Sequence, residues 1–103
     1  MAIPSSLLKL FTHHTRFDAL KFDAEGAEIY VARYPAGTVI EPHSHPTENY
    51  GVITRGELVL ITNGTEKRFG AGSWYHLDPN EVHAARFEQE TEEIEFWFKQ
   101  PVS

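Results

Sequence analysis

The chain has 103 residues, no cysteine, and nine Lys plus Arg against fifteen Asp plus Glu, which gives a formal net charge of -6. This length predicts one domain, residues 1–103, with a modest core, and the lack of cysteine excludes disulfides, thiolate metal ligands and a cysteine nucleophile. The acidic balance argues against a nucleic-acid partner and against anionic membranes, because both bind clustered basic residues.

The first 25 residues predict an arm or a short helix ahead of a barrel that spans residues 26–99. The apolar segment 7–11 follows two serines, a pattern that suits either a helix cap or the start of an extended arm. His13-His14 is interpreted as a surface pair, because adjacent residues of a strand point to opposite faces. The chain start lacks the basic and long apolar segments of a signal peptide, and no apolar run is long enough to span a membrane, so we expect a cytoplasmic protein.

Most of the remaining chain is predicted to form short strands separated by Gly, Pro, Asn or Asp. The predicted strands are 28–34, 39–45, 50–54, 58–62, 65–69, 73–77, 82–87 and 93–99. So many short strands predict an all-β antiparallel sandwich or barrel. Asn63-Gly64 is the strongest hairpin signal, since a type I′ turn needs positive φ at both central residues.

In the last predicted strand, apolar residues alternate with mostly polar ones. We expect the apolar set to face the core and the other set to face water or a second subunit. The two sets are Ile94, Phe96 and Phe98, and Glu93, Glu95, Trp97 and Lys99. Trp97 is therefore expected at a subunit contact.

Three histidines are predicted to form a metal site. His43 and His45 are two residues apart in a predicted strand, so both imidazoles project from one face and can reach one point. His83 follows the turn-like segment 78–81 and joins them only if the fold brings distant strands together. Neutral imidazoles on the inner wall of a barrel suit a divalent first-row ion that keeps open positions.

Two stretches resemble the two motifs of the cupin family. The first runs Gly37, five residues, His43-Ser44-His45, three residues, Asn49, six residues, Gly56, where the family has Glu at the Asn position. The second is the segment 72–83, which holds a Gly, a strand, a Pro-bearing turn and the last histidine. The resemblance implies a small single-domain cupin: a double-stranded β-helix or jelly-roll barrel, often a homodimer, that binds a divalent transition metal such as Fe, Mn, Ni or Zn.

Asn49 stands where relatives place a glutamate ligand, although Glu48 is chemically the better ligand for a hard cation. A slip of one residue would turn the side chain to the other face. We therefore expect Asn49 to face the metal beside the three histidines, and Glu48 to face away as a solvated carboxylate. Imidazoles and an amide leave the 2+ charge uncompensated, which strengthens the metal as a Lewis acid and favours an anionic small-molecule ligand.

Other residues near the motifs are weaker candidates. Tyr50, Trp74 and Tyr75 suit the aromatic wall of a small-ligand pocket, and ordinary packing explains each of them as well. His76 is expected either on the outer face or hydrogen-bonded to a metal ligand. Glu41 points inward only if the proline that follows it leaves the strand regular.

The nearest likeness is to pectin-degradation cupins, which convert unsaturated uronates to linear keto sugars. The acidic and arginine residues that those enzymes use near the last strand fall at Phe96 and Val102 here, and Glu95 is expected to face the other way. We therefore expect a non-redox lyase or isomerase-type enzyme in which the metal polarises an oxygen of a small keto, hydroxy or sugar acid. The alternatives are a three-histidine iron dioxygenase, which fits the missing carboxylate at position 49, and a non-catalytic ligand-binding or sensing protein.

Overall fold

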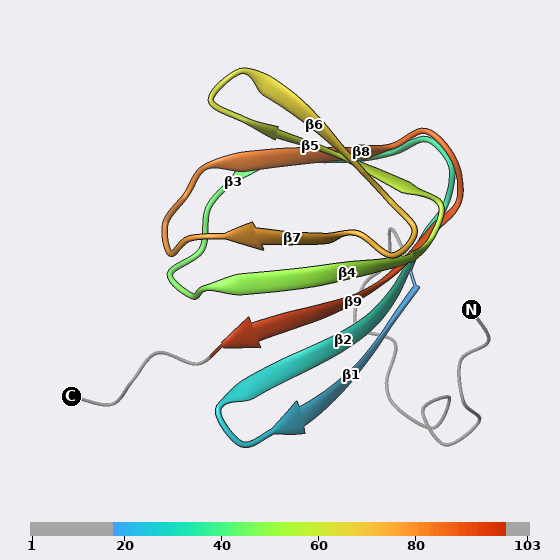
Figure 1. The fold of residues 1–103 in the computed structure, drawn as a ribbon. Coiled ribbons are helices and arrows are strands. Elements are labelled where there is room, and N and C mark those ends of the chain that lie inside the picture. The colour runs from blue at the N-terminus through green and yellow to red at the C-terminus, as the bar shows by residue number, and fades with distance from the viewer. Residues whose placement is uncertain (1–17, 99–103) are drawn as a thin grey trace.

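The computed structural model describes residues 18–98, and the regular structure in that range consists of nine strands (Figure 1). The strands are β1 Asp18–Ala24, β2 Ala27–Tyr34, β3 Thr38–His43, β4 Asn49–Arg55, β5 Glu57–Thr62, β6 Thr65–Gly70, β7 Trp74–Leu77, β8 His83–Phe87 and β9 Thr91–Phe98. Every strand pair is antiparallel. The predicted all-β class is confirmed. No helix in the described range has the length and apolar character to cross a bilayer.

The predictions for the chain start meet the structure only in part. The arm or helix at 7–11 and the pair His13-His14 lie outside the described residues. Residues 18–24, which the prediction includes in the arm, form β1 and pair with residues 27–33 of β2. The sheet therefore begins before Gly26, where the barrel was predicted to begin.

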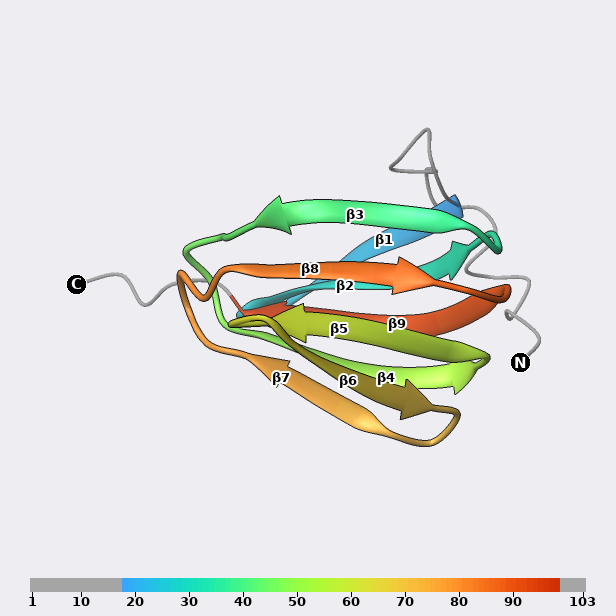
Figure 2. The same ribbon diagram turned by 90° about the horizontal axis from the view of Figure 1, so that it is seen from above.

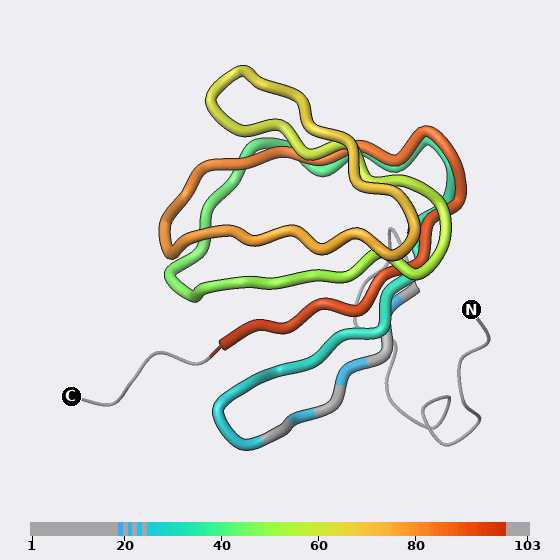
Figure 3. Tube along the Cα trace, in the orientation of Figure 1, coloured from blue at the N-terminus to red at the C-terminus, as the bar shows by residue number. Residues whose placement is uncertain are grey.

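The strands form two sheets that face each other (Figures 1 and 2). The five-stranded sheet has the order β1-β2-β9-β4-β7 and the four-stranded sheet the order β3-β8-β5-β6. The chain passes between the sheets after β2, β3, β4, β6, β7 and β8, as the tube in Figure 3 shows. These crossings bring the end of β3 and the starts of β4 and β8 to the same end of the molecule. The three histidines of the two motifs and Asn49 lie there.

Two turns have the backbone conformations that their sequences predict. Asn63 and Gly64 have φ of 50° and 74°, and they join Thr62 and Thr65 of the paired strands β5 and β6, which confirms the predicted hairpin. Gly56, the last residue of the first motif, has φ of 82° between β4 and β5. A Cβ at Gly56 would lie 2.4 Å from the carbonyl oxygen of Glu90, so this tight approach requires glycine.

The prediction for the two faces of β9 is wrong. Glu93 and Glu95 are 2% and 7% exposed and line the space between the sheets, whereas Phe98 on the opposite face is 39% exposed. Trp97 also lines the cavity and does not lie on the outer face, where it was expected. The register explains the reversal: Glu93 pairs with Ala32 of β2 and with Ile53 of β4, both of which are buried core residues. Alternation identifies two faces, but it does not say which face is inside when the interior contains polar groups.

Candidate metal centre and cavity

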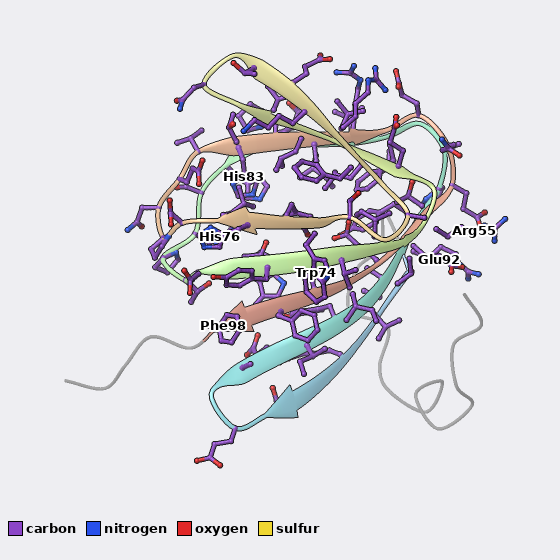
Figure 4. The ribbon with its side chains drawn as sticks, viewed as in Figure 1. Arg55, Trp74, His76, His83, Glu92 and Phe98 are labelled. Carbon is purple, nitrogen blue, oxygen red and sulfur yellow. The ribbon has the colours of Figure 1, made fainter. Side chains whose placement is uncertain are left out.

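The three predicted histidines lie together at one end of the cavity. His43 ends β3 and His83 begins β8, and the two are directly paired across the strands. His45 lies in the connection to β4, and its carbonyl accepts a hydrogen bond from the backbone N–H of Asn80 (2.7 Å), in the turn that leads to His83. One ring nitrogen from each histidine falls within 4.8 Å of the others. Figure 4 shows His83 between the two sheets, at the opposite end from Arg55 and Glu92.

Backbone carbonyls fix which nitrogen each imidazole offers. Nδ1 of His43 lies 2.8 Å from the carbonyl oxygen of Glu41, Nδ1 of His45 lies 3.1 Å from that of Thr47, and Nδ1 of His83 lies 2.9 Å from that of Glu81. A carbonyl only accepts, so each Nδ1 carries the hydrogen and each Nε2 keeps a lone pair for a ligand. His45 Nε2 is buried and has no hydrogen-bond partner within residues 18–98. This donor set fits a divalent first-row metal ion.

Burial keeps two of these imidazoles neutral. Removal from water lowers the pKa of His45 and of His83, although the hydrogen bond to a backbone carbonyl opposes the shift in each case. The positive charge that each imidazole would meet on His43 lowers both pKa values further. Neutral imidazole is the form that binds metal, so the site favours binding at neutral pH.

Asn49 and Glu48 face in different directions. Asn49 begins β4, is 2% exposed and lines the cavity. Its amide nitrogen donates to the carbonyls of Phe96 (3.0 Å) and Tyr50 (3.2 Å), so the amide oxygen is the atom suited to a metal. The Glu48 carboxylate instead lies 2.8 Å from Nε2 of His76, on the outside of the molecule.

Replacing Glu48 by glutamine is therefore expected to leave metal affinity within about twofold of the wild type. The pair with His76 is exposed, so its loss is expected to lower the free energy of unfolding by less than about 1 kcal/mol. Calorimetric titration of both proteins with Zn²⁺ and urea denaturation measure the two quantities. An affinity loss of tenfold or more in Glu48→Gln, with none in Asn49→Ala, would assign the fourth ligand to Glu48 instead.

A cavity of about 390 Å³ extends from the histidines between the sheets. Its wall is mainly apolar and aromatic, and it includes Tyr75, one of the weaker sequence candidates. Tyr50, Trp74 and His76 are exposed on the molecular surface. The charged residues that line the cavity are Glu41, Glu93 and Glu95, and no lysine or arginine lies among the described lining residues. The cavity therefore combines a histidine cluster with an acidic wall.

Glu93 and Glu95 are the site residues that the sequence reasoning missed. The Tyr75 hydroxyl donates to Oε1 of Glu93 (2.8 Å), the Trp97 indole donates to Oε1 of Glu95 (3.0 Å), and the Tyr34 hydroxyl donates to Oε2 of Glu95. Two glutamates at i and i+2 share one face of a strand, so the signal was present. The alternating pattern nevertheless predicts that this face is exposed to solvent, because strands of this kind usually bury their apolar side.

Burial sets the protonation of this group. Removal from water raises the pKa of Glu93 well above its ordinary value, and the nearby negative charge of Glu95 raises it further. Burial also raises the pKa values of Tyr34 and Tyr75, with the charges of Glu93 and Glu95 adding to the effect. Both phenols therefore remain protonated hydrogen-bond donors at neutral pH.

Comparison with known proteins agrees with this arrangement. The cupin domain family model matches residues 30–97. A segment of 68 residues, 65% of this chain, is 34% identical to the H2HPP isomerase of Bacillus subtilis, and it spans only 29% of the length of that relative. The fold is similar to the DMSP lyase DddQ of Ruegeria pomeroyi DSS-3 (24% identity, TM-score 0.73, 85% of this chain and 49% of that one). It is also similar to KdgF of a Halomonas species (14% identity, TM-score 0.72, 84% of both chains).

Proposed function

Because the chain belongs to the cupin family, we propose that it is a metal-dependent enzyme that catalyses a non-redox lyase or isomerase-type reaction on a small keto, hydroxy or sugar acid. One observation carries this proposal: a cluster of three imidazoles, two of which line the cavity, lies at one end of a cavity whose wall contains two buried carboxyl groups. The first group suits a metal ion and the second suits proton transfer, and together they are what such a reaction requires.

We assign the metal site to His43, His45 and His83, with the amide oxygen of Asn49 as the fourth ligand. A divalent ion bound there would polarise a substrate oxygen and so acidify a neighbouring C–H bond. The side chains of Leu58, Leu60 and Phe87 supply an apolar wall that excludes water from the reacting atoms. The carboxyl groups of the described lining would repel a substrate carboxylate, so that group is expected to bind at the histidine end.

The carboxylates distinguish this proposal from its alternatives. A ligand-binding protein has no need of buried carboxylates held by tyrosine and tryptophan donors, because burying them opposes folding. A dioxygenase reaction would use the metal and oxygen, and it would leave this pair without a role. The isomerase name of the Bacillus subtilis relative supports the non-redox class, although the shared segment is less than a third of that protein.

Hydrogen exchange on a panel of small acids tests the proposal. The full chain, loaded in turn with Zn²⁺, Mn²⁺, Ni²⁺ or Fe²⁺, is incubated in D₂O with pyruvate, 2-oxobutyrate, lactate or glucuronate. Proton NMR follows exchange of the hydrogen on the carbon next to the ketone carbonyl or the carboxyl group. We expect exchange with at least one metal and one probe, under nitrogen, and none after chelation. Oxygen uptake with Fe²⁺ instead would support the dioxygenase, and metal binding with neither activity would support a binding protein.

A further inference from the structure

Glu93 and Glu95 lie side by side on β9, but their hydrogen-bond partners differ. Glu95 accepts hydrogen bonds from two donors, the Tyr34 hydroxyl and the Trp97 indole. Glu93 accepts one, from the Tyr75 hydroxyl, and its Oε2 is buried without a hydrogen-bond partner in the described part of the chain. The described residues thus supply two hydrogen-bond donors to the carboxyl group of Glu95 and one to that of Glu93, and Oε2 of Glu93 receives none.

The donors are held in place by packing. The Tyr34 ring stacks on Phe87 with centroids 4.1 Å apart and planes 6° from parallel. The Tyr75 ring lies over Gly51, where a Cβ would come within 2.3 Å of ring atoms. Neither phenol can turn away without disturbing buried neighbours, so the two carboxyl groups keep different environments.

These environments favour one ionised and one protonated group. An indole N–H only donates, so the Glu95 oxygen that it meets must be an acceptor, and two donors stabilise the carboxylate form. Glu93 has a single donor and lies beside that negative charge in a buried setting. Two adjacent buried carboxylates cannot both ionise readily, so the proton remains on Glu93.

The surrounding groups do not change this assignment. The titratable groups near the pair in the same sheet are Tyr30 and Tyr34 of β2 and Tyr75 of β7. Those on the other side of the cavity are Glu41 and His43 of β3, His45 of the connection after β3, and His83 of β8. The described cavity lining offers no lysine or arginine that could neutralise a second carboxylate. A metal ligand role is also disfavoured, because neither glutamate belongs to the group of atoms that lie within 4.8 Å of one another at the histidines.

We propose that Glu93 and Glu95 share one proton and act as a single acid–base pair, with Glu95 as the proton acceptor and Glu93 as the donor. This inference rests on the proposed function. Glu95 takes a proton from a C–H or O–H of the substrate, and the electron pair of that bond stays on the substrate. Glu93 gives its proton to a second substrate atom. The proton now on Glu95 then passes to Glu93, which restores the pair with no oxidant or reductant.

The pair also limits what can bind beside it. A carboxylate or phosphate next to the ionised Glu95 would be repelled at short range in a poorly solvated cavity. A hydroxyl or a C–H group is accepted, since either can face a carboxylate. The substrate is therefore a monoacid, or an acid whose anionic group binds at the histidines and whose reacting hydroxyl or C–H reaches Glu95.

Carbon-13 NMR of the glutamate side-chain carboxyls tests the shared proton in the metal-free full chain. The variants Glu93→Gln and Glu95→Gln assign the two resonances, and Glu48→Gln is the control. We expect one carboxyl of the pair to be protonated at neutral pH, and Glu95→Gln to move the titration of Glu93 to lower pH because a neighbouring negative charge is gone. The proposal would be overturned if both carboxyl groups were ionised at neutral pH, or if Glu93 titrated at the same pH in Glu95→Gln as in the wild type.

Exchange kinetics then separate the two roles in the metal-loaded enzyme. Glu95→Gln is expected to lower substrate exchange in D₂O by about 10²–10⁴-fold, the usual contribution of a general base. Glu93→Gln is expected to retain exchange while product formation falls. Equal losses of both activities in both variants would contradict the division of roles. A wild-type protein without exchange on any probe would refute the proposed function alone, because the NMR titration does not depend on turnover.

Discussion

Replacing His83 by alanine is expected to lower the affinity for Zn²⁺ or Mn²⁺ by at least about 10²-fold. Loss of a group that merely supports a ligand already costs about 10–100-fold, and His83 supplies one of three imidazoles whose ring nitrogens lie within 4.8 Å of one another. The wild-type protein should gain about 2.7 kcal/mol of stability at a metal concentration 100 times its Kd. His83→Ala should gain almost none at the same concentration. Calorimetric titration and urea denaturation with and without metal measure the two effects.

The matched control is His76→Ala, which removes an exposed imidazole from the outer face. Its metal affinity should equal that of the wild type. Circular dichroism of the metal-free proteins checks that His83→Ala still folds, and His83→Gln provides a larger side chain if alanine leaves the site collapsed. Wild-type affinity in both His83 variants would show that the metal, if any, binds elsewhere.

Most of the fold and the pair His43 and His45 could be predicted because their signals are local, whereas His83 joins that pair through the pairing of two distant strands. Spacing alone places His43 and His45 together, and the turn residues Asn63 and Gly64 need the backbone conformation that they adopt. Gly56 has a reason visible only in the structure, since the approach of Glu90 depends on residues far along the chain. Short-range patterns therefore identified the strands from β2 onward but not β1, and the packing between the strands required coordinates.

The acidic half of the site could not be predicted, for a physical reason. Alternation in β9 assumes that carboxylates avoid the interior, and that rule fails where buried donors satisfy them. The donors are Tyr34, Tyr75 and Trp97, and Tyr34 is 61 positions from Glu95, the glutamate it binds. No short segment of the sequence contains both Tyr34 and Glu95, so a local pattern cannot reveal their contact. Positions that violate local preference in this way are candidates for functional sites.

Glu93 is therefore expected to reduce stability as pH rises, and Glu93→Gln to relieve the effect. Burial, and then the charge of Glu95, raises the pKa of Glu93 in the folded protein, whereas a glutamate in an unfolded chain titrates near about 4.3. Below that value both states carry the proton. Above it, up to the raised folded pKa, the unfolded chain has released the proton and the folded protein has not, so each increase in pH favours unfolding.

Urea denaturation of the two proteins between pH 4 and pH 9 measures this difference. The curves should meet at the acid end, because a protonated glutamate and a glutamine are both neutral and similar in shape. The wild-type curve should then fall below the variant by up to about 1.4 kcal/mol for each pH unit in the window, the slope that one proton imposes. Glu25→Gln, on an exposed turn before β2, should follow the wild type. Parallel curves for wild type and Glu93→Gln would mean that folding does not raise the pKa of Glu93. Glu93 would then not be the proton donor of the proposed acid–base pair.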